Sequence, residues 1–506
     1  MKRILYTLIL SIFALLPAKA QLTFLPRTAP ETVGLASADV KAFVDEMMTL
    51  TVTDMHGLMV LRNGKVIAEK YNEPFAAKYS HTLYSCSKTF TGAAVGMVIG
   101  DSLLTLDAHL VDFFPEALPD SVSENLAAIT VRDLLTMQSG FPVDTQMRTR
   151  YNDWIHQYLI KDVAYTPGTH FAYDSIDSYL LAAIVQKVTG MKLIDFLRQR
   201  LFKPMGITRV EWEESPEGIS CGGWGLYLQL EAMAKFGQLL LQRGEWNGMQ
   251  LIPAEWVDEM MKEQAASGTN YGYHIWMSKY PGMVRCDGAY GQYIMIVPDR
   301  QMVVAFTQCI HSDGSIESDR VWELSRKATE QAMTPGKEYR QLQLATYSLP
   351  VTKGKALSRT IATPHSISLG NNDLGWKNVI LELGRDQRKK SPTLTLHVTD
   401  RAGKTYDIVC GHQQWITGPI GGTPLNFRPF RGQFSNLPRP FYVGASYGWT
   451  SDTDLYVRLH YVNWYASCRL HFKFVDGNVQ VRILGSVTEK TLLLQSTLEP
   501  SPKFKL

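Results

Sequence analysis

The most informative segment of the chain reads Tyr84-Ser85-Cys86-Ser87-Lys88-Thr89-Phe90. Apolar residues after it recur at helical spacing, which predicts a helix over residues 87–100. The spacing Ser85-x-x-Lys88 occurs nowhere else in the chain. Three residues are just under one helical turn, so both side chains can share one face. The segment therefore predicts a hydroxyl and an amine held together at the start of a helix.

This pair of side chains suits acyl transfer. A serine hydroxyl becomes a useful nucleophile when a nearby base takes its proton. A partly buried lysine can be that base because burial lowers its pKa. The N-terminus of a helix also favours an oxyanion through its free N–H groups and dipole. Taken alone, the four-residue pattern favours a serine that only caps the helix, with an exposed lysine. The segments elsewhere in the chain favour a catalytic pair instead.

Four further segments follow in a defined order: VRDLLTMQSG at residues 131–140, PGTHFAY at 167–173, CGGWGL at 221–226 and WNG at 246–248. Together with the first segment they resemble the motifs of the serine β-lactamase and penicillin-binding protein superfamily, in its class C-like branch. The resemblance covers about residues 30–333. It implies an α+β catalytic domain of the β-lactamase/transpeptidase type, with an antiparallel sheet, covering helices and a helical region.

The resemblance also implies roles for individual residues. Ser85 would attack a carbonyl and form an acyl-enzyme, with Lys88 as its base. Tyr173 would pass a proton to the leaving group, as a phenolate or through Lys88. The backbone N–H of Ser85 would form half of the oxyanion hole. The strand carrying Gly288 and Ala289 would supply the other half.

Two motifs depart from the family pattern. The usual Tyr-x-Asn reads Tyr173-Asp174-Ser175, so Ser175 stands where an amide-binding Asn is expected. The third motif usually begins with a cation, but the matching stretch reads CDGAYGQ at residues 286–292. Asp287 there would repel the carboxylate of penicillins and D-Ala-D-Ala peptides. This stretch is more similar to the esterase and 6-aminohexanoate-dimer hydrolase branch. For Tyr290 the sequence allows two interpretations: it lines the substrate pocket, or it packs as an aromatic residue in the core.

Strand and hairpin signals frame the catalytic region. Apolar runs on both sides of Asn63-Gly64 predict a hairpin over residues 57–69. A second pair of strands is predicted over 293–306, around a turn at 298–300. Helices are predicted over 176–188 and 231–241, each followed by a glycine. Strands at both ends of a helix-rich middle predict an α+β layer structure.

The remainder of the chain changes character. Residues 334–364 contain Pro and Gly breaks and are predicted to be a linker with one short strand. Residues 365–506 carry short alternating strands, including a hairpin around Asp476-Gly477, and predict a small all-β barrel or sandwich domain. The motif GASYG at 444–448 matches a nucleophile elbow, but no helix pattern follows it, which favours a loop.

The N-terminus predicts export. Lys2 and Arg3 precede an apolar run and an Ala18-Lys19-Ala20 ending, as in a signal peptide spanning residues 1–20. The mature protein is therefore expected in the periplasm, without a membrane span. Export permits disulfides, and the six cysteines leave Cys410–Cys468 and Cys221–Cys286 as open pairings.

Composition and charge narrow the functional class. The chain has 506 residues, and 51 Lys and Arg against 48 Asp and Glu give a net charge of +3. A net charge so close to zero does not indicate a protein that binds nucleic acid. No metal-binding motif occurs, and the expected chemistry needs no metal or organic cofactor. The partner is expected to be a small-molecule or peptide substrate.

These motifs are compatible with two functions. The first is an exported serine hydrolase that cleaves an ester or amide through a Ser85 acyl-enzyme. The second is a penicillin-binding, sensor-type or otherwise non-hydrolytic binding protein on the same fold. The joint presence of Ser85, Lys88 and Tyr173 favours the enzyme.

Overall fold

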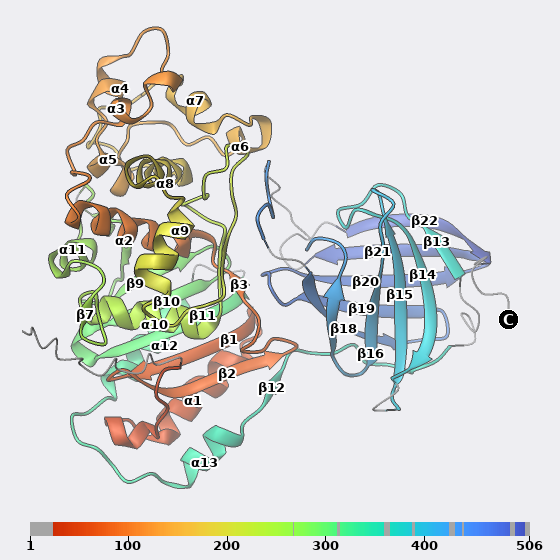
Figure 1. Cartoon of the computed structure of the whole chain (residues 1–506). Helices are drawn as coiled ribbons and strands as arrows, with labels where there is room; N and C mark the ends of the chain where they lie inside the picture. The colour runs from red at the N-terminus through yellow and green to blue at the C-terminus, as the bar shows by residue number, and fades with distance from the viewer. Residues whose placement is uncertain are drawn as a thin grey trace, which may run out of the picture.

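The computed structural model describes residues 24–500 apart from residues 267, 311–313, 359–364, 387–389, 425–430, 438–439 and 486–490. The predicted signal peptide lies outside the described residues. Within these ranges no helix combines the length and the apolar character needed to cross a bilayer. Figure 1 shows a helix-and-sheet region formed by the first two thirds of the chain and a β-sheet region formed by the remainder.

Most of the helices lie in the first two thirds of the chain. Their bounds are α1 Ser37–Thr49, α2 Ser87–Gly100, α3 Leu110–Phe113, α4 Glu124–Ala128, α5 Val131–Leu135, α6 Met147–Arg150, α7 Trp154–Leu159, α8 Ser175–Thr189, α9 Leu193–Leu197, α10 Leu230–Leu241, α11 Ala254–Met260, α12 Ser315–Arg326 and α13 Lys337–Leu344.

Strands occur at both ends of this region and then continuously toward the C-terminus. The first group is β1 Thr53–Arg62, β2 Lys65–Glu73, β3 His81–Thr82, β4 Val210–Trp212, β5 Leu226–Leu228, β6 Glu245–Trp246, β7 Met249–Gln250, β8 Trp276–Met277, β9 Val284–Gly288, β10 Gln292–Val297, β11 Met302–Ile310 and β12 Tyr347–Ser348. The second group is β13 His365–Ser368, β14 Trp376–Arg385, β15 Pro392–Asp400, β16 Thr405–His412, β17 Ile416–Ile420, β18 Phe441–Trp449, β19 Asp454–Tyr461, β20 Ser467–Val475, β21 Asn478–Gly485 and β22 Thr491–Pro500.

A seven-stranded sheet organises the first region, in the order β12-β2-β1-β11-β10-β9-β8. Both hairpins that the sequence predicted for this region form part of this sheet. Asn63 and Gly64 adopt φ values of 48° and 71°, the left-handed geometry of a tight hairpin turn between β1 and β2. The strands β10 and β11 pair in register from Tyr293 with Phe306 onward. The α+β prediction is therefore confirmed at the level of its central sheet.

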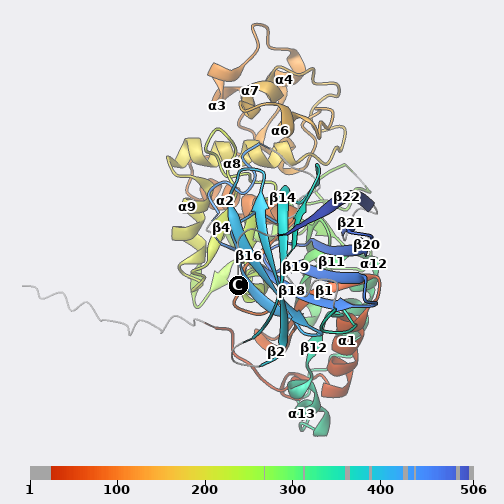
Figure 2. The same ribbon diagram turned by 90° about the vertical axis from the view of Figure 1, so that its right-hand side faces the viewer.

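Helices cover both faces of this sheet. The helices α1 and α12 pack on one face and α13 packs against α1, while α10 packs on the opposite face. Gly237 lets α10 approach closely, because a Cβ there would lie 2.6 Å from side-chain atoms of Ile294 and Val303. Beyond α10 lie α2 and α8, and both views place α3, α4, α6 and α7 at the far end of the molecule from α13 (Figures 1 and 2).

The helices α2 and α8 are buried along most of their length and pack against each other. The helix α8 starts at Asp174, whose side chain accepts from the Ile176 N–H at 2.9 Å, and ends at Gly190 with φ 69°. The sequence predicted the glycine at the end of this helix, whereas the Asp174 cap was not predicted. Firm packing of both helices fixes the start of α2 relative to the start of α8, which is where the predicted site residues lie.

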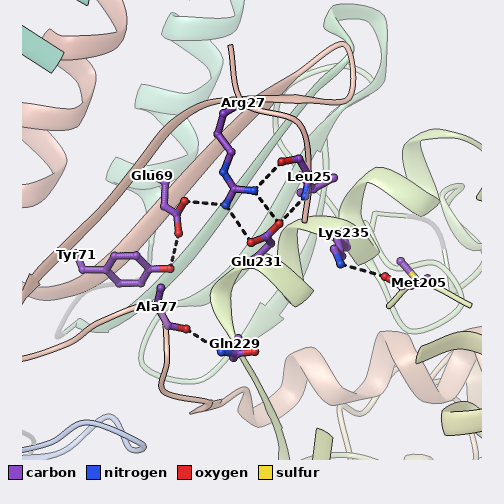
Figure 3. A network of polar contacts seen from close by, with 9 residues as sticks. All are labelled: Leu25, Arg27, Glu69, Tyr71, Ala77, Met205, Gln229, Glu231 and Lys235. Carbon is purple, nitrogen blue, oxygen red and sulfur yellow. Dashed lines mark hydrogen bonds and ion pairs between the residues drawn. The ribbon is translucent and has the colours of Figure 1, made fainter. Parts of the chain in front are cut away.

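The first described residues are tied to the sheet by a polar network (Figure 3). The Arg27 guanidinium donates to Glu69 in β2 and to Glu231 in α10, in each case at 2.9 Å. The Leu25 N–H donates to Glu231 at 2.6 Å, and the Tyr71 hydroxyl donates to Glu69 at 3.1 Å. The network joins the N-terminal segment to two elements that are distant in sequence.

The C-terminal region is one ten-stranded sheet, in the order β16-β15-β14-β13-β22-β21-β20-β19-β18-β17. A parallel pairing of Gly411 with Ser446 joins β16 to β18, so the sheet is a nearly closed barrel. The predicted hairpin is present, with Asp476 and Gly477 at φ 48° and 76°. Alternating apolar residues fill the interior. Of the two predicted architectures, barrel and sandwich, the structure has the barrel, and the domain boundaries remain a prediction.

Three local expectations need correction. The segment 334–364 contains the predicted short strand β12, but it also contains the helix α13, which was not predicted. The GASYG motif lies within β18 and not in a loop, and Ser446 is fully buried there. All six cysteines are buried, and neither Cys410–Cys468 nor Cys221–Cys286 forms a disulfide. Burial as small apolar side chains accounts for them.

Candidate active site

Ser85 lies in a short 3-10 turn, Tyr84–Cys86, that leads directly into α2. The preceding Tyr84 has φ 48°, a conformation that non-glycine residues adopt at a cost. The turn directs Ser85 into a cavity at the start of α2. Its Oγ accepts a hydrogen bond from the Lys88 Nζ at 3.0 Å. The predicted hydroxyl–amine pair is therefore present in the structure.

Lys88 is buried, with 1% of its surface exposed. Its Nζ donates to Ser85, to the Ser175 Oγ at 2.9 Å and to the Gly223 carbonyl at 2.8 Å. Burial, followed by repulsion from Arg148, lowers the pKa of Lys88 to about 7. A large fraction of the amine is therefore uncharged near neutral pH. An uncharged amine with three oxygen neighbours is able to accept a proton from one of them.

Tyr173 lies just before α8 and faces the same pair. Its ring lies 4.7 Å from the Lys88 Nζ and packs against Tyr271 and Trp276. Burial raises the pKa of the Tyr173 phenol, and its hydrogen bond with Ser85 opposes that rise only in part. The phenol therefore carries its proton at neutral pH. In this geometry Tyr173 can relay a proton, while Lys88 is the better base.

Acidic groups at the start of α8 support the site from outside the cavity. The Ser139 Oγ donates to the Asp177 carboxylate at 2.9 Å, and Tyr158 donates to both Asp174 and Asp177. Burial raises the pKa of both carboxyls. The Ser-Gly end of the VRDLLTMQSG segment thus has a structural function, because the Ser139 hydroxyl donates to a buried acid close to Lys88.

The turn after β9 closes the other side of the site. Gly288 abuts the nucleophile turn, and a Cβ there would lie 2.2 Å from the Leu83 carbonyl oxygen. Only glycine fits such an approach. Ala289 and Tyr290 line the cavity next to Ser85. This arrangement places the backbone of the β9–β10 turn beside the nucleophile, as an oxyanion hole requires.

Asp287 does not stand free in the cavity. Its carboxylate accepts from the Arg285 Nε at 2.7 Å. Burial raises the pKa of Asp287, and the Arg285 guanidinium opposes the rise. The predicted repulsion of a substrate carboxylate by Asp287 is thus weakened by a neighbouring cation. Among the described residues that line the cavity, Arg148 is a cation that the motif analysis missed.

The cavity has a volume of about 610 Å³. Its lining includes Ser85, Ser175, Ala289 and Tyr290 from the sequence prediction. It also includes residues that sequence reasoning missed or assigned elsewhere: Tyr84, Arg148, Glu213, Trp224, Gln433 and Trp464. Arg148 lies over the Trp224 ring, 4.4 Å from its centre. Tyr84 and Trp224 lie within the quoted motifs but were given no role there. No local motif marks the other four residues, because they come from separate segments that only the fold brings together.

The C-terminal sheet contributes to this cavity. The turn between β19 and β20 carries Trp464 and Tyr465, and the Thr82 N–H donates to the Asn463 carbonyl at 3.2 Å. The Trp464 ring lies 5.5 Å from the Tyr84 ring. Trp464 is buried, and it also forms a wall of the cavity that contains Ser85.

Comparisons with known proteins agree with this geometry. The model of the Beta-lactamase family matches residues 40–324, which is more than half of the chain. A curated relative, the 6-aminohexanoate-dimer hydrolase of Paenarthrobacter ureafaciens, is 26% identical over 266 residues, covering 49% of this chain and 67% of that protein. Protein flp of Staphylococcus aureus is 25% identical over 175 residues, and the match spans only 34% of its length.

Solved structures show the same fold. A candidate 6-aminohexanoate-dimer hydrolase from Bacillus anthracis aligns with a TM-score of 0.51 and 20% identity, over 60% of this chain and 88% of that one. A candidate beta-lactamase from Bacteroides dorei aligns with a TM-score of 0.50 and 18% identity, over 58% of this chain and 99% of that one. The family match, the shared fold and the arrangement of the site lead to one conclusion: the chain belongs to the beta-lactamase family of serine hydrolases.

Proposed function

We propose that the protein cleaves an ester or an amide through an acyl-enzyme on Ser85. The observation that carries this proposal is the 3.0 Å contact between the Ser85 Oγ and a buried lysine whose pKa is lowered to about 7. A nucleophile and its base lie at hydrogen-bond distance inside a cavity. Both belong to one rigid helix start, which keeps their distance fixed.

The first half-reaction follows from this contact. Neutral Lys88 takes the Ser85 proton while the Oγ attacks the substrate carbonyl carbon. The carbonyl oxygen becomes an oxyanion next to the backbone of Ser85 and of the β9–β10 turn, whose N–H groups would stabilise it. The carbon–leaving-group bond then breaks, and the leaving group takes up the proton. The product is an ester between Ser85 and the acyl part of the substrate.

Tyr173 would carry the proton between Lys88 and the leaving group. Its raised pKa keeps the phenol protonated, so it can donate one proton and accept another in the same step. In the second half-reaction water loses a proton to Lys88 and attacks the acyl carbon. Ser85 then recovers its proton, and the acid product leaves.

The substrate is proposed to differ from penicillins. The third motif lacks the usual cation, and Asp287 and Arg285 stand at its place as a pair. A curated relative hydrolyses a 6-aminohexanoate dimer by name, which supports small esters or amides as the substrate class. Arg148 offers a cation elsewhere in the cavity, at a position different from that of the third motif.

A steady-state assay with 4-nitrophenyl butyrate separates the enzyme from the non-hydrolytic alternative. Sustained release of many equivalents of 4-nitrophenol per protein, lost in Ser85→Ala, is expected. Release of a single equivalent followed by arrest would instead indicate a binding or sensor protein that acylates once. No release at all would contradict the proposed nucleophile.

The protein is further proposed to act in the periplasm. The basis is the signal-peptide pattern of residues 1–20. Expression of the full chain, osmotic-shock fractionation and N-terminal sequencing test this. A mature N-terminus at Gln21 in the periplasmic fraction is expected. Recovery of an uncleaved chain in the cytoplasm would contradict it.

A further inference from the structure

Glu213 is a buried carboxyl in the wall of the active-site cavity. It follows β4 directly and is 1% exposed. Its Oε1 accepts from the Tyr227 hydroxyl at 2.9 Å. Its Oε2 is buried and makes no hydrogen bond of normal geometry with the described residues. A buried carboxylate oxygen without a partner is costly, and such a group calls for an explanation.

The backbone holds Glu213 in a fixed position relative to the catalytic lysine. The Glu213 N–H donates to the Gly225 carbonyl at 2.8 Å, and the Cys221 N–H donates to the Glu213 carbonyl at 2.9 Å. The same loop carries Gly223, whose carbonyl accepts from Lys88. The carboxyl is therefore part of the site's rigid frame and is not a flexible surface group.

The surroundings of Glu213 are typical of amine recognition. Among the described residues that line the cavity it is the single acid. The lining of the same cavity includes the aromatic rings of Tyr84, Tyr290 and Trp464. Aromatic faces attract cations, and a carboxylate supplies the counter-charge and a hydrogen-bond acceptor. An apolar or anionic group would leave the Oε2 lone pairs unused.

We propose that Glu213 binds a protonated amine of the substrate, so that the preferred substrates are esters or amides that carry an ammonium group near the scissile carbonyl. This inference rests on the proposed function and names its substrate class. Burial raises the pKa of Glu213 to about 8, and the Tyr227 hydroxyl and the Phe434 backbone N–H oppose the rise. A bound ammonium would favour the ionised carboxylate and thereby gain a charge-assisted hydrogen bond.

A matched pair of substrates tests the proposal. Benzyl alaninate and benzyl 2-methylpropanoate have the same shape, but the first carries an ammonium where the second carries a methyl group. Both enantiomers of the alanine ester are assayed at pH 7 by release of benzyl alcohol. Because an ammonium group also activates the ester chemically, each kcat/KM is divided by the hydroxide rate of the same ester. The wild type is expected to prefer one alaninate by at least about tenfold, as for a charge pair in a binding site.

Two glutamine variants test whether Glu213 causes the preference for the ester that carries an ammonium group. Glu213→Gln keeps the shape but removes the charge, and it should reduce the preference to near unity while the neutral ester is still cleaved. Glu211→Gln makes the same change two residues earlier, on β4, where the side chain lines a different cavity. It should retain the full preference. Thermal unfolding of each variant confirms that the comparison is made on folded protein.

The outcomes separate this inference from the proposed function. Cleavage of the neutral ester by the wild type without an ammonium preference would overturn the inference and leave the hydrolase intact. An equal preference in Glu213→Gln and the wild type would do the same. If Glu213→Gln does not fold, the wild-type comparison still decides. Failure of the wild type to cleave either ester, together with no turnover of 4-nitrophenyl butyrate, would refute both proposals.

Discussion

The ring of Tyr290, in the turn after β9, stacks on the ring of Tyr465, in the turn between β19 and β20. The ring centres are 3.8 Å apart and the planes are inclined by 2°. Tyr84, which precedes the nucleophile, contacts both rings edge-on. An aromatic cluster therefore connects the C-terminal sheet to the nucleophile turn, and the sheet forms part of the cavity that contains Ser85.

Substitution of Trp464 should weaken substrate binding. Trp464→Leu opens the wall of the cavity, and we expect KM for 4-nitrophenyl butyrate to rise by about tenfold, a loss of ~1.4 kcal/mol in binding. The value of kcat should change little, because Ser85 and Lys88 keep their contact. Steady-state kinetics measures both constants.

Trp376→Leu is the matched control for this change. Trp376 is as buried as Trp464, at 2% exposure, but it lies in the barrel interior and does not line the cavity. It should lower stability without changing KM. A comparable rise of KM in both variants would show that Trp464 acts only through general stability.

The sequence predicted those site residues that lie within one short segment or one motif. Ser85 and Lys88 are three residues apart at one helix start, so helix geometry allows their contact. Tyr173 was found because the PGTHFAY segment resembles a family motif. Arg148, Glu213 and Trp464 lie on three segments far apart in sequence. Their convergence depends on tertiary packing, which short-range periodicity does not encode.

The same limit explains the errors in the fold prediction. Hairpins with Asn63-Gly64 and Asp476-Gly477 were predictable because the turn type demands positive φ at both residues. The helix α13 was missed because its single buried residue, Leu342, leaves a weak apolar pattern. The placement of GASYG in a strand depends on pairing with β17 and β19, which no local signal reveals.

Activity should fall in acid through Lys88. The lysine must be neutral to accept the Ser85 proton, and its pKa is about 7. We expect kcat/KM to decrease about tenfold for each pH unit below 7 and to level off above it. Lys88→Arg stays protonated at every accessible pH and should reduce acylation by about 10² to 10⁴. A pH–rate profile that is flat from pH 5 to 8 would exclude Lys88 as the base.

Removal of the Tyr173 hydroxyl should affect amides more than activated esters. An amine leaving group needs a proton, whereas 4-nitrophenolate leaves without one. Tyr173→Phe keeps the ring that packs on Tyr271 and Trp276. We expect at least about a 10²-fold loss with an anilide and a clearly smaller loss with a 4-nitrophenyl ester. Equal losses with both substrates would indicate a structural role for the hydroxyl.

Three buried histidines predict a loss of stability in acid. The His56 Nδ1 lies 3.0 Å from the His81 Nε2, and His460 of β19 lies in the same cluster. Burial lowers the pKa of His81 and of His460 from 6.5 to about 4. The folded state thus binds fewer protons than the unfolded state between these values, and stability falls as pH decreases from 6.5 to 4.

The expected loss is about 3 kcal/mol for each of these two rings by pH 4, at 1.36 kcal/mol per pKa unit. Arg458 and Arg469 contribute to the lowered pKa of His460, and Asp54 opposes it. Urea unfolding at a series of pH values measures the slope. His460→Phe keeps the ring against Trp415 and should make the slope shallower. An unchanged slope would assign the acid sensitivity to other groups.

The central claim is that Ser85 is an activated nucleophile, and intact-mass analysis after labelling tests it most directly. Purified protein is incubated with a fluorophosphonate and, separately, with benzylpenicillin, in parallel with Ser85→Ala. We predict one phosphonyl adduct on the wild type with displacement of fluoride, none on the variant, and no stable penicilloyl adduct on either. A stable penicilloyl adduct would identify a penicillin-binding protein. A fluorophosphonate adduct that persists in Ser85→Ala, or the absence of any adduct on folded wild type, would contradict the assignment of Ser85.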